Sequence, residues 1–177
     1  MRKLLLIGPG GAGKSTLASI IGARIGLPVV HLDALYWRPG WIEPPREEWR
    51  ATLAPLLAQD AWVMDGDFGG TLDLRLAAAD TVVVFDLPPL LCLWRVLRRR
   101  LRYHGRTRPD MASGCPEKID LEFVWWILSY RKRKRRTLLP KLSAWAEAPG
   151  RRLHVLDSPR AVQALVDALP QAFNRAQ

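Results

Sequence analysis

Short runs of apolar residues alternate with longer amphipathic stretches along this chain of 177 residues. Five of the runs have the length and composition of β-strands and lie at residues 3–7, 28–32, 61–64, 81–85 and 153–156. Their apolar residues are consecutive rather than alternating, which is typical of strands that are covered on both faces. The pattern therefore predicts an α/β fold built on a parallel sheet.

The stretches between these runs carry the 3.6-residue periodicity of helices. We expect helices over residues 14–25, 47–58, 117–139 and 162–169, with Pro55 kinking or shortening the second of them. Arginines crowd between residues 95 and 108, where glycine and proline begin to interrupt the helical pattern. A mobile basic loop joined to two helices is expected there.

The composition indicates one packed domain over residues 1–177. Hydrophobic residues make up 49% of the chain and charged residues 25%, which excludes global disorder. Lys and Arg number 27 against 17 Asp and Glu, so the formal net charge is +10. This excess favours an anionic partner such as a phosphate, a nucleotide, nucleic acid or an acidic lipid surface, without choosing among them.

The sequence argues against a membrane-spanning, secreted or disulfide-stabilised protein. The longest apolar run, residues 123–128, falls far short of the roughly 20 residues that a spanning helix needs. The apolar start at residues 4–7 is also shorter than the roughly 7–15 residues of a secretory signal. Cys92 and Cys115 form no CxxC pair, so we expect neither a disulfide scaffold nor zinc and take the cytoplasm as the compartment.

Residues 8–15, GPGGAGKS, match the phosphate-binding motif G-x-x-x-x-G-K-[ST] in full, between a predicted strand and a predicted helix. The backbone N–H groups of such a loop and the start of its helix surround a polyphosphate. Lys14 would reach the β- and γ-phosphates of ATP, and the Ser15 hydroxyl would bind Mg²⁺. The alternative is a glycine-rich turn that only caps a helix. The predicted nucleotide-binding residues here are Gly8, Gly10, Gly11, Ala12, Gly13, Lys14, Ser15 and Thr16.

Two carboxylates follow predicted strands at the edge where parallel sheets bind ligands. Asp65 ends an apolar strand and could orient the water shell of Mg²⁺, or it could simply begin a turn before Gly66. Asp33 follows the second strand and could hold a substrate hydroxyl or accept its proton, or it could be a helix cap or turn residue. Trp37 and Trp41 lie in the next loop, where they could contact a substrate or pack the loop itself.

These features together resemble nucleoside monophosphate kinases and shikimate or gluconate kinases. More narrowly, the segments HLDALYWRPGW (31–41), DGDF (65–68), TLDLR (71–75) and RPDM (108–111) resemble the bacterial topology modulation proteins. That group consists of adenylate-kinase-like P-loop proteins. The likeness extends to about residue 139 and implies a sheet in the order 2-3-1-4-5, a substrate-side insertion at about 34–58 and a lid at about 99–117.

The resemblance also implies roles for individual residues. Asp65 would hold the metal shell, and Arg75 would contact an anionic part of the substrate. Arg160 would lie beside the adenine ring, within the segment 157–160. The arginines expected near the transferring phosphate are Arg99, Arg106 and Arg108 in the lid and Arg131 and Arg135 on the following helix. Asp67-Phe68 stands where adenylate kinases have Phe-Pro-Arg, which argues against a nucleoside monophosphate as substrate.

The sequence therefore predicts a kinase that uses ATP and Mg²⁺ and transfers the γ-phosphate to a small acceptor. The main alternative is a nucleotide-dependent DNA-binding protein. The run RKRKRR at residues 131–136 covers every side of a helix, so part of it could bind nucleic-acid phosphates. No zinc finger, RNP-like aromatic motif or evident helix-turn-helix accompanies that run.

Overall fold

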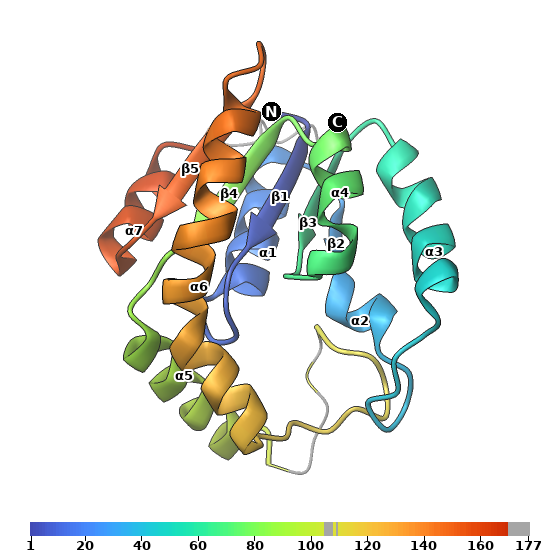
Figure 1. The fold of residues 1–177 in the computed structure, drawn as a ribbon, viewed down its shortest axis with the longest axis vertical. Helices are drawn as coiled ribbons and strands as arrows, with labels where there is room; N and C mark the ends of the chain where they lie inside the picture. Colours follow the sequence, from blue (N-terminus) through green and yellow to red (C-terminus); the bar gives the residue numbers. More distant parts are fainter. Residues whose placement is uncertain (105–107, 109, 170–177) are drawn as a thin grey trace, which may run out of the picture.

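Five parallel strands form one sheet in the order β2-β3-β1-β4-β5 (Figure 1). The computed structural model describes residues 1–104, 108 and 110–169. Each pairing in the sheet is parallel, so the predicted fold class and strand order are confirmed. The strands are β1 (Lys3–Ile7), β2 (Val29–His31), β3 (Trp62–Asp65), β4 (Thr81–Phe85) and β5 (Arg152–Leu156).

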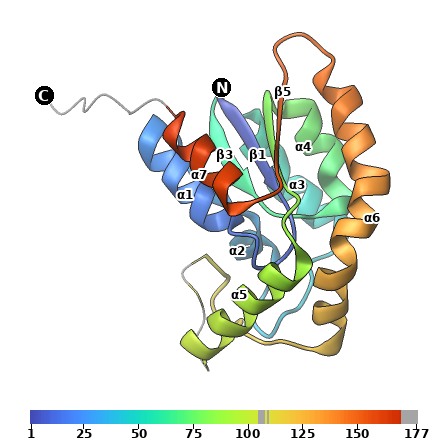
Figure 2. The ribbon, with the colours of Figure 1, turned by 90° about the vertical axis from the view of Figure 1, so that its left-hand side faces the viewer.

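Helices lie against both faces of the sheet. Figure 2 shows α1 and α7 on one side, with α3, α4 and α6 on the other. Alternation of strands and helices along the chain is the arrangement expected for parallel pairing, because each strand must cross over before the next one starts. The helical elements are α1 (Lys14–Ile25), α2 (Leu32–Tyr36), α3 (Arg46–Ala58), the 3-10 turn η1 (Gly69–Thr71), α4 (Leu72–Ala78), α5 (Pro89–Arg102), α6 (Leu121–Ala146) and α7 (Pro159–Asp167).

The strands bury both of their faces, which is why they appear as unbroken apolar runs. Leu4 and Leu6 of β1 pack into one core with side chains of α1, α5 and α7. Leu5 and Ile7, which alternate with them, pack into a second core with α3, α4 and α6. Successive side chains of a strand point to opposite faces, so these four residues link the two layers of helices through the sheet.

The predicted helix over 117–139 is shifted in the structure. It begins at Leu121, because Asp120 is its N-cap and accepts a 2.8 Å hydrogen bond from the Phe123 amide. It also continues through Pro140 to Ala146. Burial of Leu142 against the sheet stabilises the last turns in spite of the amide that proline lacks.

The closing helix also starts earlier than its apolar pattern suggests. Ser158 accepts a 3.2 Å hydrogen bond from the Ala161 amide, and Pro159 occupies the first helical turn. Serine at the cap followed by proline is a common helix start. Among the residues that the structure describes, no helix is both long enough and apolar enough to pass through a bilayer.

The segment between α5 and α6 lies beside the loop that follows α2 (Figure 1). The amide of Gly40 donates to the carbonyl of Gly114 at 2.9 Å. Gly114 has a φ of +75° and packs against Pro39, where a Cβ would come within 2.9 Å of the proline ring. The predicted lid and the predicted insertion therefore touch each other and together close one end of the molecule.

Candidate functional site

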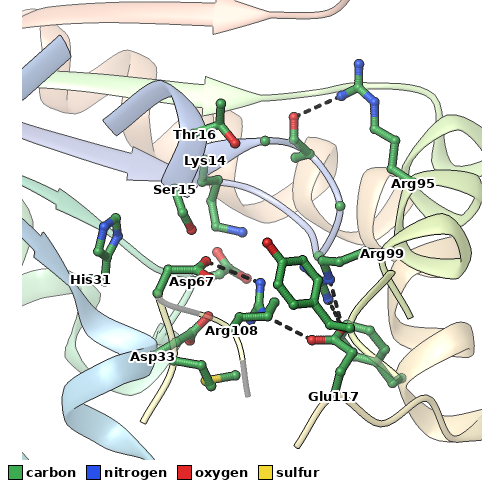
Figure 3. A pocket seen from close by; sticks show the side chains of 18 of the residues that line it. Lys14, Ser15, Thr16, His31, Asp33, Asp67, Arg95, Arg99, Arg108 and Glu117 are labelled. Atoms are coloured by element: carbon green, nitrogen blue, oxygen red, sulfur yellow. Dashed lines mark hydrogen bonds and ion pairs between the residues drawn. The ribbon is translucent and has the colours of Figure 1, made fainter. Parts of the chain in front are cut away.

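A cavity of about 1150 Å³ opens at the carboxyl edge of the sheet (Figure 3). Residues of the glycine-rich loop, the start of α1, the loop after α2, and α5 line it together with the segment before α6. A ligand pocket for one drug-sized molecule measures roughly 300–1,000 Å³. This cavity is therefore large enough for a nucleotide and a small second ligand.

The glycine-rich loop turns tightly between β1 and α1. Gly13, just before α1, has a φ of +98°, and Gly11 has a φ of +76°. A Cβ on Gly11 would lie 2.2 Å from the carbonyl oxygen of Cys92 in α5, so only glycine fits there. The Arg95 guanidinium donates to the Ala12 carbonyl at 3.2 Å. Helix α5 thus holds the loop in its curled conformation.

Lys14 and Ser15 start helix α1 and line the cavity. The Lys14 ammonium donates to the carbonyl of Pro9 at 3.0 Å, so its charge lies over the curve of the loop. The Ser15 hydroxyl donates to Asp65 at 2.7 Å. A positive charge and the amino end of a helix at the same point attract an anion.

Asp65 is buried at the end of β3 and accepts hydrogen bonds through both carboxylate oxygens. Oδ2 accepts from Ser15, and Oδ1 lies 2.6 Å from Nδ1 of His31. Since a carboxylate only accepts, Nδ1 carries the hydrogen. The hydrogen bond to Asp65 raises the pKa of His31 above its ordinary value, and burial acts in the opposite direction. The three side chains form a connected polar row, of which Ser15 and His31 line the cavity.

Asp33 lines the cavity from the first turn of α2. Burial raises the pKa of its carboxyl group above the usual value, while the charges of Lys14 and Arg108 lower it. Figure 3 shows Asp33 on the same side of the cavity as Lys14 and Ser15. A carboxylate with a raised pKa that lines the same cavity as Lys14 has the chemistry of a general base.

The lid arginines meet at one buried carboxylate. Nε of Arg99 donates to Oε1 of Glu117 at 2.8 Å, and Nε of Arg108 lies 2.9 Å from Oε2 (Figure 3). Arg108 also pairs with Asp110 at 3.2 Å. Both arginines line the cavity as the sequence predicts, and Glu117 holds them in place. Arg106 lies outside the described residues.

Trp37 and Trp41 form part of the same wall. Their rings meet edge to face with centroids 5.3 Å apart. Trp41 has a φ of +66° and donates from its indole nitrogen to the Pro116 carbonyl at 3.0 Å. Both rings pack against the lid cluster of Met111, Ala112 and Cys115 and also line the cavity. The two alternatives for these tryptophans, packing and substrate contact, are thus compatible.

Arg75 does not reach the cavity, in contrast to the predicted contact with substrate. Its side chain is fully buried in α4 and donates to the carbonyls of Gly66, at 2.9 Å, and Phe68. Burial lowers the pKa of Arg75 to about 10, which leaves the guanidinium protonated at neutral pH. Its position follows from local geometry, because the first turns of α4 face back toward the chain that leaves β3. Arg75 stabilises the loop that carries Asp67.

Arg131 and Arg135 lie away from the predicted phosphate position. Asp86, just after β4, accepts from Nε of Arg131 at 3.1 Å and from Nη2 of Arg135 at 2.6 Å. They border a separate, smaller depression with Leu128 and Lys132. Both arginines lie on the side of α6 that faces Asp86, and they pair with this carboxylate instead of pointing toward the predicted nucleotide position.

Of three other predicted residues, Thr16 lines the cavity and Gly8 and Arg160 do not. Gly8 packs closely against Phe85 of β4, where an added Cβ would lie 2.7 Å from Cβ of Phe85. Arg160 is exposed and is not among the residues that line it, whereas its neighbours Pro159 and Val162 are.

Sequence reasoning missed His31 and Asp67. His31 is the last residue of β2 and lies at the same sheet edge as Asp33. Its position at the end of a predicted strand could have identified it as a candidate site residue. Asp67 lines the cavity, accepts from the Tyr130 hydroxyl at 2.8 Å and lies 3.6 Å from the Lys134 ammonium. Burial raises the pKa of Asp67. Its partners come from α6, more than 60 residues away, so no local pattern could reveal them.

Comparisons with known proteins show the same fold. A gluconokinase from Sinorhizobium meliloti 1021 has a TM-score of 0.57 and 16% identity over 94% of this chain and 87% of its own. A sugar kinase from Janibacter sp. HTCC2649 has a TM-score of 0.53 and 17% identity over 94% and 93% of the two chains. A shikimate kinase from Bacteroides thetaiotaomicron has a TM-score of 0.51 and 16% identity, over 93% of each chain.

No family model and no curated protein matches the chain. At this level of identity the three likenesses show a P-loop kinase fold. They do not support the narrower resemblance to the topology modulation proteins, nor do they favour the DNA-binding alternative.

Proposed function

We propose that this protein is a phosphotransferase that binds ATP at the glycine-rich loop and transfers its γ-phosphate to a hydroxyl of a small acceptor. The observation that carries the proposal is that Lys14, Ser15 and Asp33 line one cavity and that Ser15 is hydrogen-bonded to Asp65. Phosphoryl transfer needs a group that binds the phosphates, oxygen ligands for a metal ion and a base for the acceptor hydroxyl. Lys14, the Ser15–Asp65 pair and Asp33 would supply them in that order.

The loop amides and Lys14 would bind the β- and γ-phosphates, and α1 would contribute its amino end. At the far side of that loop, Ile20, Pro159 and Val162 line the cavity with apolar surface. A flat, largely apolar base fits such a surface. This arrangement supports the predicted position of the adenine ring near the start of α7, without a contact from Arg160.

Ser15 and Asp65 fit a magnesium ion in their chemistry. Both offer oxygen atoms, which are the ligands that Mg²⁺ prefers, and they already lie 2.7 Å apart. When bound, the ion would supply positive charge that offsets the charge of the phosphate oxygens. His31 would keep the Asp65 carboxylate oriented through the bond to Oδ1.

Asp33 would act on the acceptor. Its carboxylate accepts the proton of the acceptor hydroxyl as that oxygen bonds to the γ-phosphorus, and the bond from phosphorus to the ADP oxygen breaks. The products are ADP, the phosphorylated acceptor and a proton held by Asp33. Arg99 and Arg108 would lie beside the transferring group, where guanidinium groups stabilise the charge on its oxygens.

ADP formation by the purified protein tests the proposal. With magnesium, ATP and a panel of small hydroxyl compounds, we expect one class of acceptor to raise ADP formation well above the hydrolysis background. Lys14→Ala should abolish the acceptor-dependent rate, while Lys132→Ala, an exposed lysine of α6 outside the cavity, should preserve it. A rate that no acceptor raises, or one that survives in Lys14→Ala, would contradict the assignment.

A further inference from the structure

The end of the cavity next to Asp33 carries several carboxylates, and we call it the acceptor end. Asp33 and Asp67 lie at the sheet edge, Asp110 of the predicted lid acts on Asp33 through its charge, and Glu43 lines the same cavity from the loop after α2. Among the described residues, Asp67 accepts a hydrogen bond from Tyr130 and pairs with Lys134, and Asp110 pairs through Oδ2, so each keeps acceptor capacity. Ionised carboxylates only accept hydrogen bonds, so their natural ligands are O–H and N–H groups.

The arginines of this region each contact an acceptor of the protein, although the buried Nε atoms of Arg75 and Arg108 have no hydrogen-bond partner. Arg75 donates to two backbone carbonyls and does not line the cavity. Arg108 lies between Glu117 and Asp110, at 2.9 Å and 3.2 Å. Arg99 shares the same Glu117. Among the described residues, Arg75, Arg99 and Arg108 each contact an acceptor of the protein itself. The proposed function assigns Arg99 and Arg108 to the transferring phosphate, which leaves neither of them for a second anionic group of the acceptor.

Lys134 is also paired with a carboxylate of the protein and lies outside the cavity. Its ammonium lies 3.6 Å from Asp67, on the side of α6. Burial is the largest cause of the raised pKa of Asp33; the charges of Lys14 and Arg108 lower that pKa, and the carboxylates of Asp65 and Asp110 raise it. A further negative charge next to Asp33, Asp67 and Asp110 would meet like charges. The positive groups that line the same cavity include Lys14 and Arg108, which the proposed function uses, and Lys118, which lies over the Trp41 ring.

The two tryptophans add an apolar surface to this end. The indole N–H of Trp41 is bonded to Pro116, and the packing of both rings on the lid cluster fixes their orientation. Aromatic faces pack well against the C–H groups of a ring or chain that carries hydroxyls at its edges. Carboxylates for the hydroxyls and indoles for the carbon skeleton together match an uncharged, polyhydroxylated compound.

We propose that the phosphate acceptor is a neutral polyhydroxylated compound of the size of a monosaccharide or polyol, and that compounds with a carboxylate or phosphate group are rejected. This inference rests on the proposed phosphotransferase function and specifies its substrate class. The free hydroxyls donate to Asp67, Glu43 and Asp110, while Asp33 accepts the proton of the reacting hydroxyl. Rejection of acids follows from repulsion, which is a common basis of specificity.

Matched pairs of compounds test the charge of the acceptor directly. Glucose is compared with gluconate, a pentitol with its aldonic acid, and a nucleoside with its 5′-monophosphate, and the phosphorylated product is identified by mass spectrometry. We expect kcat/KM to be at least about tenfold higher for the neutral member of the accepted pair. A preference for the acid member, or no phosphorylation of any neutral compound in the panel, would overturn the proposal.

Removing negative charge from the acceptor end gives a second readout. Glu43→Gln and Asp110→Asn should each lower the ratio of kcat/KM for the neutral compound to kcat/KM for the acid by at least about threefold. The affinity for ATP should not change. Glu47→Gln is the matched control, because Glu47 is exposed at the start of α3 and does not line the cavity. An unchanged preference in both cavity variants would count against the carboxylates as its source.

Binding of Mg-ATP separates the failure of this inference from the failure of the proposed function. If the protein binds Mg-ATP and forms ADP in a Lys14-dependent way while preferring acids, only the acceptor class is wrong. If it neither binds ATP nor forms ADP, the phosphotransferase assignment itself is wrong, and the acceptor class falls with it.

Discussion

The hydroxyl of Ser15 lies 2.7 Å from Oδ2 of Asp65, although 50 residues separate them in the sequence. The sheet brings them together, because β1 and β3 are neighbours and Leu6 stands opposite Asp65 in their register. Ser15 follows β1 by a single tight loop, so the pairing of two strands determines the distance between the glycine-rich loop and Asp65. The site is therefore a direct product of the strand order.

The close approach of the glycine-rich loop to α5 makes Gly11 sensitive to substitution. In Gly11→Ala, the new Cβ would lie 2.2 Å from the Cys92 carbonyl oxygen at a φ of +76°, so the loop must open. We expect ATP affinity to fall at least tenfold, measured by equilibrium titration with Mg-ATP. Gly69→Ala is the control, since nothing lies within 4 Å of its added Cβ. Equal affinities of the two variants would show that the loop conformation is not critical.

The raised pKa of Asp33 predicts the pH dependence of transfer. The group must be ionised to accept a proton, and burial raises its pKa, so kcat/KM should fall as the pH drops through a value above the ordinary range of Asp. Asp33→Asn should lower the rate by about 10²–10⁴-fold and remove that acidic limb. An acidic limb that persists in Asp33→Asn would assign the titration to another group.

The raised pKa of Asp33 also predicts that its ionised carboxylate lowers the free energy of unfolding. A carboxyl group whose pKa is higher in the folded state is harder to ionise there, so it lowers the free energy of unfolding as pH rises above its unfolded pKa. Asp33→Asn should therefore be as stable as the parent at pH 7 or more stable, by urea denaturation. A clear loss of stability would show that the carboxylate has a structural partner.

Arg75 is expected to support the fold and not the substrate. Arg75→Met would leave the Gly66 and Phe68 carbonyls without their buried donor, which should lower the free energy of unfolding by about 2–4 kcal/mol. Arg50→Met, at an exposed position of α3, should change it little. If Arg75→Met kept full stability and only raised KM for the acceptor, the predicted substrate contact would be correct after all.

The α/β fold class and the glycine-rich loop could be predicted because their signals are local, whereas the strand order was implied by the resemblance to known kinases. Residues 8–15 form one contiguous motif, and Asp65 ends a strand that is recognisable by itself. The positions of Arg75, Arg131 and Arg135 could not be predicted in this way. An arginine side chain reaches in many directions, and which acceptor it meets depends on partners such as Asp86 that the sheet brings into reach.

Helix ends show the same difference between features that local sequence indicates and features that depend on tertiary contacts. Asp120 and Ser158 are cap residues that a closer look at local sequence can find. The passage of α6 through Pro140 depends instead on the burial of Leu142 and Trp145 against the sheet, which only the tertiary structure provides. His31 belongs to the second group, because its role arises from contact with Asp65 on the adjacent strand.

Calorimetric titration of the protein with ATP in the presence of magnesium tests the central claim most directly. The account predicts saturable binding at one site, weakened at least tenfold in Lys14→Ala and unchanged in Lys132→Ala. Absence of any binding heat at several temperatures, or equal affinity of the parent protein and Lys14→Ala, would contradict it.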